Sequence, residues 1–235
     1  LNYAIAAVRL ASMDALIQQS NAVDSLSNVD VLCLDKTGTL TSNKLHLETI
    51  VPVGMTEDQV RALLGDFSAS VTSPNKTSEA IHTAISGTKR GFNDEVPFTS
   101  TLKWSALSFD DAERTGVVAM GAPEILGPLL ASEPTPPEEV AQWAHRGLRV
   151  LLVAYAPQSA TLKEGDALPQ LPSDIQAIAW LAFSDELRPQ VQQTLESFRT
   201  AGIKLKVISG DNPTTVAALA RQAGLSRASA ISGLE

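Results

Sequence analysis

Two nearly continuous apolar runs, one near each end of the chain, stand out in the pattern of hydrophobic and polar positions. Val29 to Leu34 is rich in β-branched residues and is followed by Asp35. Ile203 to Ile208 is followed by Ser209-Gly210-Asp211. Short apolar runs of this kind predict strands that are buried on both faces, as in a parallel sheet. Each strand is expected to end in a polar loop, where open α/β sheets bind their ligands.

Helix signals follow the second run. Asn212 is a good N-cap, Pro213 suits the first helical position, and Gly224 is a stop signal after the helix formers of Val216 to Ala223. The Ala-, Leu- and Gln-rich stretch from Leu1 to about Gln19 also predicts a helix. The chain therefore has a strand followed by a loop and a helix near each end.

The middle of the chain has a different pattern, in which strand-like and helical stretches are separated by turn-rich segments. Strands grouped in this way favour an α+β unit with an antiparallel sheet. The predicted architecture is an α/β domain, residues 1–47 and 185–235, interrupted by an inserted α+β domain, residues 48–184. Within the insertion we expect strands at 104–109, 116–120, 148–155 and 177–183, and helices at 56–64, 78–85 and 138–145.

Composition narrows the range of partners. The 235 residues are 44% hydrophobic and 19% charged with a formal charge of -8, which suits a globular core and argues against a nucleic-acid partner. No apolar run approaches the roughly 20 residues of a membrane-spanning helix, and the N-terminus lacks a secretory signal pattern. The single cysteine, Cys33, excludes an intramolecular disulfide and is expected to be buried in its strand. The three histidines lack the spacing of a zinc site.

The segment Asp35-Lys36-Thr37-Gly38-Thr39-Leu40-Thr41 carries the strongest chemical signal. It places a carboxylate at the end of a predicted strand, before a Gly- and Thr-rich loop whose N–H groups can face an anion. Lys36 adds positive charge, and a carboxylate in such a setting can act as a nucleophile that forms an acyl phosphate. An Asp that begins a turn is the commoner reading of an isolated residue, but it does not explain the whole segment.

This segment resembles the phosphorylation motif of P-type ATPases, which belong to the haloacid dehalogenase-like superfamily. The resemblance implies that Asp35 accepts a phosphoryl group from ATP. Phosphatases of the superfamily usually carry a second Asp two residues after the nucleophile, as a general acid and base, whereas this chain carries Thr37. We therefore favour a cation pump over the alternative, a soluble haloacid dehalogenase-like phosphatase. An inert nucleotide-binding module is the third hypothesis.

Two further segments extend the resemblance. Ser209-Gly210-Asp211 is similar to the family's Thr-Gly-Asp, with Ser209 supplying a hydroxyl to the phosphate, and its place before a helix suits anion binding. Asp185-Glu-Leu-Arg188-Pro resembles the hinge segment, which implies that Asp185 and Arg188 lie near the ATP phosphates and ribose. Each segment alone is also explained as an ordinary turn, but their order after Asp35 favours the family.

A nucleotide pocket is implied by the inserted residues. Phe98 resembles the family's adenine-stacking Phe, and Lys103 its nearby cation, although Phe98 taken alone is more simply a core residue. Gly121-Ala122-Pro-Glu is similar to the Lys-Gly-Ala-Pro-Glu signature, with Met120 in place of the lysine.

Two charged residues complete the implied pocket. Arg149 matches a strand arginine that reaches the phosphates, and Glu79 matches a glutamate near the base. A half-exposed strand arginine and a helix-start carboxylate favoured by the dipole are the respective alternatives.

The resemblance implies a Rossmann-like haloacid dehalogenase-type phosphorylation domain, incomplete at its C-terminus, with an inserted nucleotide-binding domain. It also implies the cytoplasmic portion of an integral plasma-membrane pump. The expected cofactor is Mg2+, held by the Asp35 carboxylate and the Thr37 main-chain carbonyl, with ATP as the substrate. Expected partners are the transported cation, the actuator domain and the membrane helices. The family's phosphate-site lysine and Gly-Asp-Gly-x-Asn-Asp segment do not occur before Glu235, so we expect the isolated chain to bind nucleotide with little or no turnover.

Overall fold

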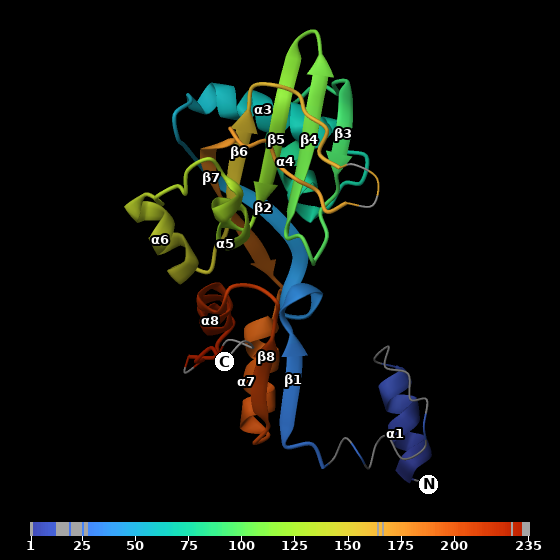
Figure 1. The fold of residues 1–235 in the computed structure, drawn as a ribbon. Helices are drawn as coiled ribbons and strands as arrows, with labels where there is room; N and C mark the ends of the chain where they lie inside the picture. The colour runs from blue at the N-terminus through green and yellow to red at the C-terminus, as the bar shows by residue number, and fades with distance from the viewer. Residues whose placement is uncertain are drawn as a thin grey trace.

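The two terminal apolar runs form one small parallel sheet. The computed structural model describes residues 2–12, 19, 25, 28–163, 165, 167–226 and 228–231. Strand β1 (Val31–Asp35) pairs with β8 (Lys204–Ile208) in a parallel register that sets Asp35 opposite Ile208. Figure 1 shows this pair in the lower part of the molecule, beside helices α7 (Val191–Thr200) and α8 (Pro213–Gln222).

The residues between β1 and β8 in sequence contain a six-stranded antiparallel sheet. Its spatial order is β2-β7-β6-β5-β4-β3, and every neighbouring pair in it is antiparallel. Successive side chains of a strand point to opposite faces of the sheet, so each central strand contributes one row of side chains to each face. The strands are β2 (Thr41–Pro52), β3 (Phe92–Val96), β4 (Trp104–Asp111), β5 (Arg114–Gly121), β6 (Arg149–Ala156) and β7 (Gln176–Leu187).

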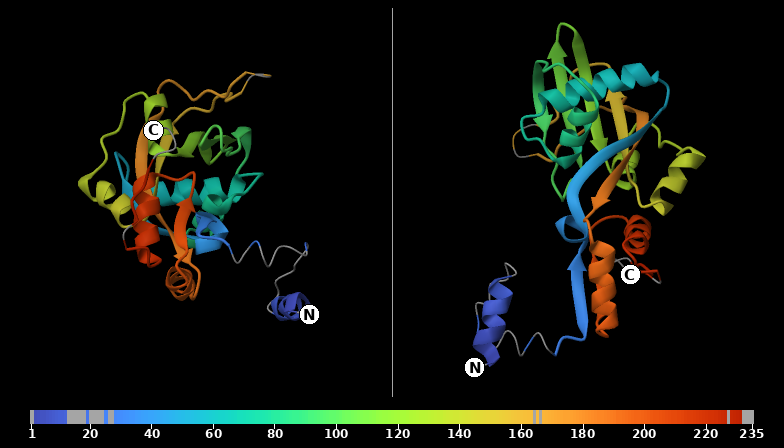
Figure 2. Two further views of the ribbon diagram at one scale, coloured as in Figure 1. Left: turned by 90° about the horizontal axis from the view of Figure 1, so that it is seen from below. Right: turned by 180° about the vertical axis from the view of Figure 1, so that it is seen from behind.

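Helices cover both faces of the large sheet. Helices α3 (Glu57–Ser70) and α4 (Lys76–Ala84) pack on one face, where Leu64, Phe67 and Ile81 are fully buried. On the other face lie α5 (Pro123–Leu126), a short 3-10 turn (Gly127–Leu129) and α6 (Glu138–His145). Figure 2 shows the two helical layers on opposite sides of the sheet. Helix α1 (Asn2–Ala11) precedes β1 in the chain.

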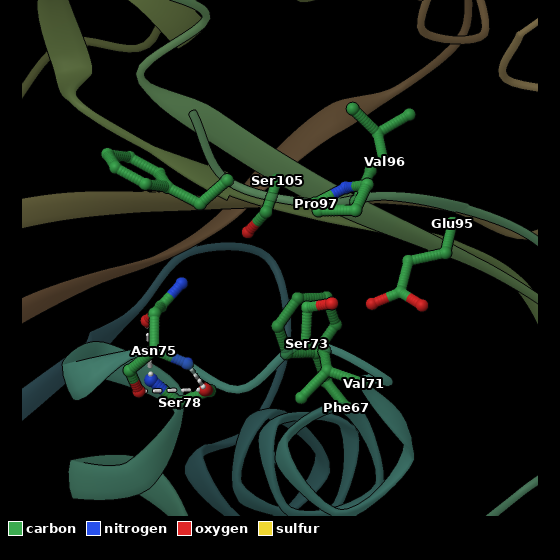
Figure 3. Close-up of a pocket in the computed structure, with 11 residues that line it drawn as sticks. Phe67, Val71, Ser73, Asn75, Ser78, Glu95, Val96, Pro97 and Ser105 are labelled. Carbon is green, nitrogen blue, oxygen red and sulfur yellow. Dashed lines mark hydrogen bonds between the residues drawn. The ribbon is translucent and has the colours of Figure 1, made fainter. Parts of the chain in front are cut away.

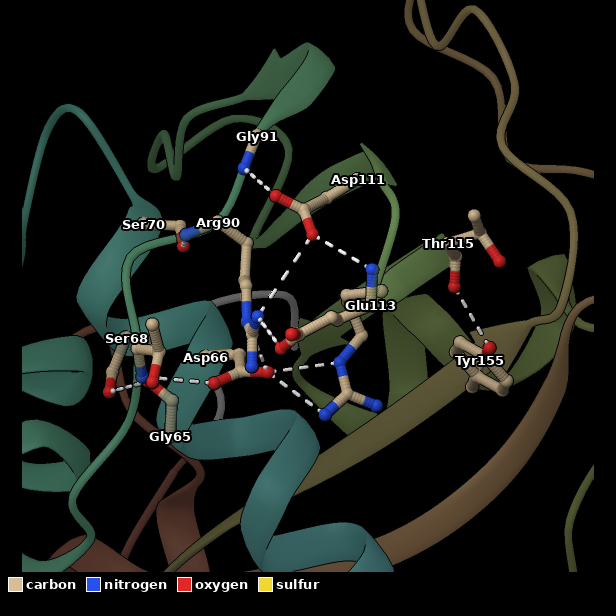
Figure 4. A network of polar contacts seen from close by, with 12 residues as sticks. Gly65, Asp66, Ser68, Ser70, Arg90, Gly91, Asp111, Glu113, Thr115 and Tyr155 are labelled. Atoms are coloured by element: carbon tan, nitrogen blue, oxygen red, sulfur yellow. Dashed lines mark hydrogen bonds and ion pairs between the residues drawn. The ribbon is translucent and has the colours of Figure 1, made fainter.

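A charged cluster ties α3 to the start of β5 and to the loop before β3. The buried carboxylate of Asp66 accepts hydrogen bonds from Arg114 Nη2 at 2.9 Å and from Arg90 Nε at 3.3 Å. Its other oxygen accepts from the Thr88 main-chain N–H at 3.0 Å. Figure 4 shows Arg90 and Asp66 side by side within this network. The cluster fixes the loop after α4 against α3, because a buried carboxylate needs such partners.

Two long strands connect the two sheets. β2 and β7 run side by side as an antiparallel pair from the small sheet into the large one (Figure 1). Their register shifts between Thr41, opposite Leu187, and Leu45, opposite Asp185, which leaves extra residues on β2. Asn43 in this bulge has a left-handed backbone with φ of 61°. A bulge of this kind bends the strand locally.

Most of the elements expected from the pattern are present. The predicted strands correspond to β1, β4, β5, β6, β7 and β8, and the predicted antiparallel sheet is confirmed. The N-terminal helix is present over Asn2–Ala11, and residues 13–18 of that prediction lie outside the described part. Strands β2 and β3 and helix α7 were not anticipated. None of the helices in the described residues has the length and apolar character needed to span a membrane.

Two predictions about burial are wrong. Residues of β1 alternate between exposed and half-buried, whereas burial on both faces was expected. Leu34 and Val207 face a small core with α7, while Val31 and Ile208 are exposed. Cys33 shares the open face and is exposed, not buried. The physical reason is that only one face of the two-stranded sheet is covered in the described residues.

Candidate functional site

Asp35 lies at the carboxyl end of β1, beside the loop that follows β8. It is the last residue of its strand and stands opposite Ile208, so Ser209-Gly210-Asp211 begins immediately beyond its partner. Its side chain is exposed. Within the described residues, its carboxylate has no hydrogen-bond or ion-pair partner. The carboxylate is therefore open to a ligand at the edge where α/β sheets bind them.

Lys36 has the opposite orientation and is buried between two carboxylates. Its Nζ lies 2.6 Å from Asp211 Oδ2 and 3.0 Å from Asp185 Oδ2. Burial alone would lower the pKa of Lys36, but the hydrogen bonds and charges of Asp211 and Asp185 outweigh it and raise the pKa. Burial would likewise raise the pKa of Asp211, but Lys36 and the charge of Arg149 lower it. Lys36 and Asp211 are therefore both held in their charged forms at neutral pH.

The loop after Asp35 is shaped by one glycine and one arginine. Gly38 has a φ of 75°, a conformation that side-chain-bearing residues rarely adopt. Arg188 donates to the Gly38 carbonyl from Nη2 at 2.7 Å and from Nε at 3.1 Å. Its main-chain N–H also donates to the Leu40 carbonyl at 2.9 Å. The predicted hinge arginine thus fixes the backbone of the loop that carries Thr37.

A cleft lies between the small sheet and the large one, next to this loop. Helix α8 contacts the segment before β6 beside this cleft, where the Thr215 hydroxyl donates to the Leu148 carbonyl at 3.3 Å. The cleft is lined by positive side chains as well as Asp185, an arrangement suited to a polyanion. The lining residues are Lys36, Thr37, Asn43, Leu45, Lys76, Gly147, Arg149, Asp185, Thr215 and Leu219.

A second, smaller cavity lies between the large sheet and helices α3 and α4. Phe98 borders it with 41% of its surface exposed, so this ring is not a core side chain. Ser105 contributes a polar group from β4, and Asn75 and Ser78 contribute polar groups from the start of α4 (Figure 3). An exposed aromatic face beside a few polar groups is the usual composition of a small-molecule site.

Several residues of the predicted nucleotide pocket do not line either cavity. Glu79 is exposed and pairs with Lys76 at 3.0 Å, while its neighbour Ser78 faces the smaller cavity. Lys103 is exposed in a turn with a φ of 57°. Ala122 is the N-cap of α5.

Gly121 and Met120 have packing roles. A Cβ on Gly121 would stand 2.5 Å from Trp104 Cβ, so a glycine lets the two strands pack closely there. Met120, which replaces the expected lysine, is 4% exposed and belongs to the core beneath α3 and α4.

Some cavity residues were not anticipated from the sequence. Asn75 and Ser105 line the smaller cavity, and Lys76 lines the cleft. An Asn followed three residues later by Ser, before Ala80 and Ile81, is a recognisable helix-start pattern that could have placed Asn75 at the N-cap. No sequence signal distinguishes Ser105 from the other polar residues of its strand.

The fold and the edge site define a known class of protein. Residues 29–233 match the haloacid dehalogenase-like hydrolase family, and the chain belongs to that family.

Similar proteins within this class are cation-transporting ATPases, in agreement with the P-type ATPase resemblance of the Asp35 motif. The chain is 37% identical over 222 residues to the probable cation-transporting ATPase exp7 of Streptococcus pneumoniae, covering 93% of this chain and 27% of the relative. It is 33% identical over 227 residues to the calcium-transporting ATPase CtpE of Mycolicibacterium smegmatis, covering 95% and 26%. It is 30% identical over 272 residues to the probable cation-transporting ATPase I of Mycobacterium leprae, covering 100% and 17%. The chain therefore spans about a quarter or less of the length of these relatives.

Proposed function

We propose that this chain is the nucleotide-binding and phosphorylation portion of an ATP-driven cation pump. In the proposed reaction an Asp35 carboxylate oxygen attacks the γ-phosphorus of ATP. The bond from that phosphorus to the bridging oxygen breaks, and ADP leaves. The observation that carries the proposal is the open, unpaired carboxylate of Asp35 beside the Ser209–Asp211 loop.

The neighbouring charges support this role for Asp35. Lys36 neutralises Asp185 and Asp211, so two carboxylates near the incoming phosphates are compensated. Arg149 reaches this area from the large sheet and lines the cleft. The Ser209 hydroxyl accepts from the Asp211 N–H at 3.2 Å, which orders the loop and leaves its O–H to donate to a phosphate. In this arrangement Lys36 positions the two loops and is not a direct phosphate ligand.

The oxygen donors near Asp35 fit Mg2+ together with a nucleotide. Mg2+ commonly takes one or two protein carboxylates and fills its other positions with water and substrate phosphates. Asp35 offers one free carboxylate, and Thr37 offers a main-chain carbonyl on the cleft-lining loop. In the part of the chain that the structure describes, no group of three or more acidic, His or Cys side chains is placed to hold a metal ion. The metal would offset phosphate charge during transfer.

The two cavities suggest how ATP is held. The exposed ring of Phe98 would stack on the base, and the cleft lined by Lys76 and Arg149 would accept the phosphates. Expected partners in the intact pump are the membrane helices, the actuator domain and the transported cation, with this portion on the cytoplasmic side.

Phosphorylation of the full-length transporter from γ-labelled ATP tests the proposal. Wild type is expected to form an acid-stable, hydroxylamine-sensitive phosphoenzyme, and Asp35→Asn is expected to abolish both labelling and transport. Asp30→Asn, which alters an exposed carboxylate before the same strand, is the matched control. Retained labelling or transport in Asp35→Asn would contradict the proposal.

The isolated chain separates the pump from the phosphatase alternative. It is expected to bind ATP but to hydrolyse neither ATP nor p-nitrophenyl phosphate appreciably. Rapid Asp35-dependent hydrolysis of p-nitrophenyl phosphate would favour the soluble phosphatase, and binding without any Asp35-dependent labelling in the full-length protein would favour the inert module.

A further inference from the structure

Asn75 points a hydrogen-bond donor of fixed orientation into the cavity beside Phe98. Its Oδ1 accepts from the main-chain N–H of Thr77 at 2.9 Å and from that of Ser78 at 3.1 Å. Only the oxygen of an amide can accept, so these two bonds determine which way the amide faces. The Nδ2 group must then lie on the other side, and Figure 3 shows it directed toward the sheet.

Ser105 faces Asn75 from the opposite wall of the same cavity. Its side chain, on β4, is only 7% exposed, and its hydroxyl points into the space between the sheet and α4 (Figure 3). Within the described residues, neither the Ser105 hydroxyl nor Asn75 Nδ2 has a hydrogen-bond partner. Asn75 is only partly buried, and neither unpaired atom is shielded from solvent, so both are free to bond a polar ligand that enters the cavity.

The cavity combines these groups with an aromatic surface. Phe98 lines it and is 41% exposed, which makes its ring available for stacking. A flat ligand stacked on such a ring presents its edge to nearby polar side chains. Asn75 can only donate from Nδ2, whereas the Ser105 hydroxyl can accept. The edge that suits this pair has an acceptor next to a donor, as in the ring nitrogen and exocyclic amine of adenine.

We propose that Asn75 and Ser105 read the edge of an adenine stacked on Phe98, and so determine the base specificity of this chain. Asn75 Nδ2 donates to ring nitrogen N1 of adenine, and Ser105 Oγ accepts from the neighbouring exocyclic amine. This inference rests on the proposed nucleotide binding. A base that carries N–H at that ring position would place a donor against the donor of Asn75. Neither donor would then have an acceptor, and this disfavours binding of such a base.

The affinity ratio of ATP to inosine triphosphate in the isolated chain tests the role of Asn75. Inosine carries N–H at the ring position and a carbonyl in place of the amine. Wild type is expected to prefer ATP by at least about tenfold. Asn75→Asp keeps the helix cap, because Asp is an equally good N-cap, but turns an acceptor toward the base. In Asn75→Asp, the ratio of the ATP affinity to the inosine triphosphate affinity is expected to fall to about one or to reverse. Any general repulsion of the triphosphate cancels in the ratio.

Two further variants complete the test. Thr56→Asp puts the same charge at the N-cap of α3, where Thr56 lies outside the residues that line the cavity, and is expected to keep the wild-type ratio. Ser105→Ala is tested with purine riboside triphosphate, which lacks only the amine. Loss of the amine should weaken binding about tenfold in wild type and have no effect in Ser105→Ala.

The outcomes separate this inference from the proposed function. If wild type binds ATP and Asn75→Asp leaves the ratio of ATP to inosine triphosphate affinity unchanged, the proposed role of Asn75 is overturned. An amine effect that persists in Ser105→Ala overturns the role of Ser105 and stays informative if Asn75→Asp fails to fold. Wild type that binds no nucleotide overturns the proposed function itself, and this inference with it.

Discussion

The ammonium group of Lys36 lies 3.0 Å from the carboxylate of Asp185, a residue 149 positions further along the chain. Lys36 directly follows β1, whereas Asp185 belongs to β7 of the large sheet. The same ammonium group also pairs with Asp211 in the loop after β8. One buried cation therefore holds three separate segments together around the exposed Asp35.

Replacing Lys36 is expected to destabilise the protein. In Lys36→Met, the largely buried Asp185 and Asp211 lose their shared partner, and such a loss costs about 3 kcal/mol of unfolding free energy. Urea denaturation followed by circular dichroism measures the change. The control is Lys206→Met, which removes an exposed lysine from β8 and should cost far less. Equal midpoints for Lys36→Met and wild type would show that the three-residue contact contributes no net stability.

The pH dependence of stability follows from two of these groups, Asp211 and Lys36. The folded state lowers the pKa of Asp211, so its stabilising effect is present above the ordinary value of 3.8 and is lost as the pH falls through the lower folded value. The folded state raises the pKa of Lys36, so its effect is present below 10.5 and is lost as the pH rises through the higher folded value. The stability difference between wild type and Lys36→Met should be largest near neutral pH and shrink at both extremes. Urea titrations at acidic, neutral and alkaline pH measure it, and a difference that grows toward either extreme would contradict the assignment.

Cys33 is expected to react readily in the folded protein. It is the only cysteine and is exposed on the open face of β1, two residues before Asp35. A colorimetric thiol reagent should label one equivalent in native buffer nearly as fast as in urea, because exposure and not unfolding limits access. Cys33→Ala should remove the signal. Labelling that requires urea would mean that this face is covered in solution.

Gly87 is expected to tolerate no side chain. A Cβ on Gly87 would stand 2.0 Å from the carbonyl oxygen of Gly65, where the loop after α4 crosses α3. Gly87→Ala must therefore push backbone away from backbone, which should cost at least about 2 kcal/mol. Gly127→Ala is the control, because the nearest atom to its added Cβ would be 3.8 Å away. Thermal unfolding of both variants tests the difference, and similar melting temperatures would refute the steric argument.

The pattern of hydrophobic and polar residues predicted well those helices and strands whose formation depends on residues close together in the sequence. The apolar alternation of Trp104 to Phe109 and the helix signals at Asn212 and Pro213 are local properties of the chain, and both elements form. Burial is not local. Cys33 is exposed because nothing in the described residues packs against its face of β1, and an apolar run cannot reveal which of its faces will be covered.

The candidate site shows the same division. The motif places Asp35 at a strand end, and the parallel register brings it beside Ser209. The cavity lining depends instead on tertiary packing, so Asn75 and Ser105 face one cavity only when α4 packs on the large sheet. The outward orientation of Glu79 likewise follows from which face of α4 the core selects.

The paired strands β2 and β7 limit how the two halves of the molecule can move against each other. Because both connections belong to one hydrogen-bonded ribbon, independent swivelling of the halves would break its ladder. Bending across the ribbon at the bulge around Asn43 breaks fewer of these bonds. The half that contains Phe98 is therefore expected to approach and leave Asp35 along a single, reproducible arc. In a pump, one such path would let every phosphate arrive in the same alignment.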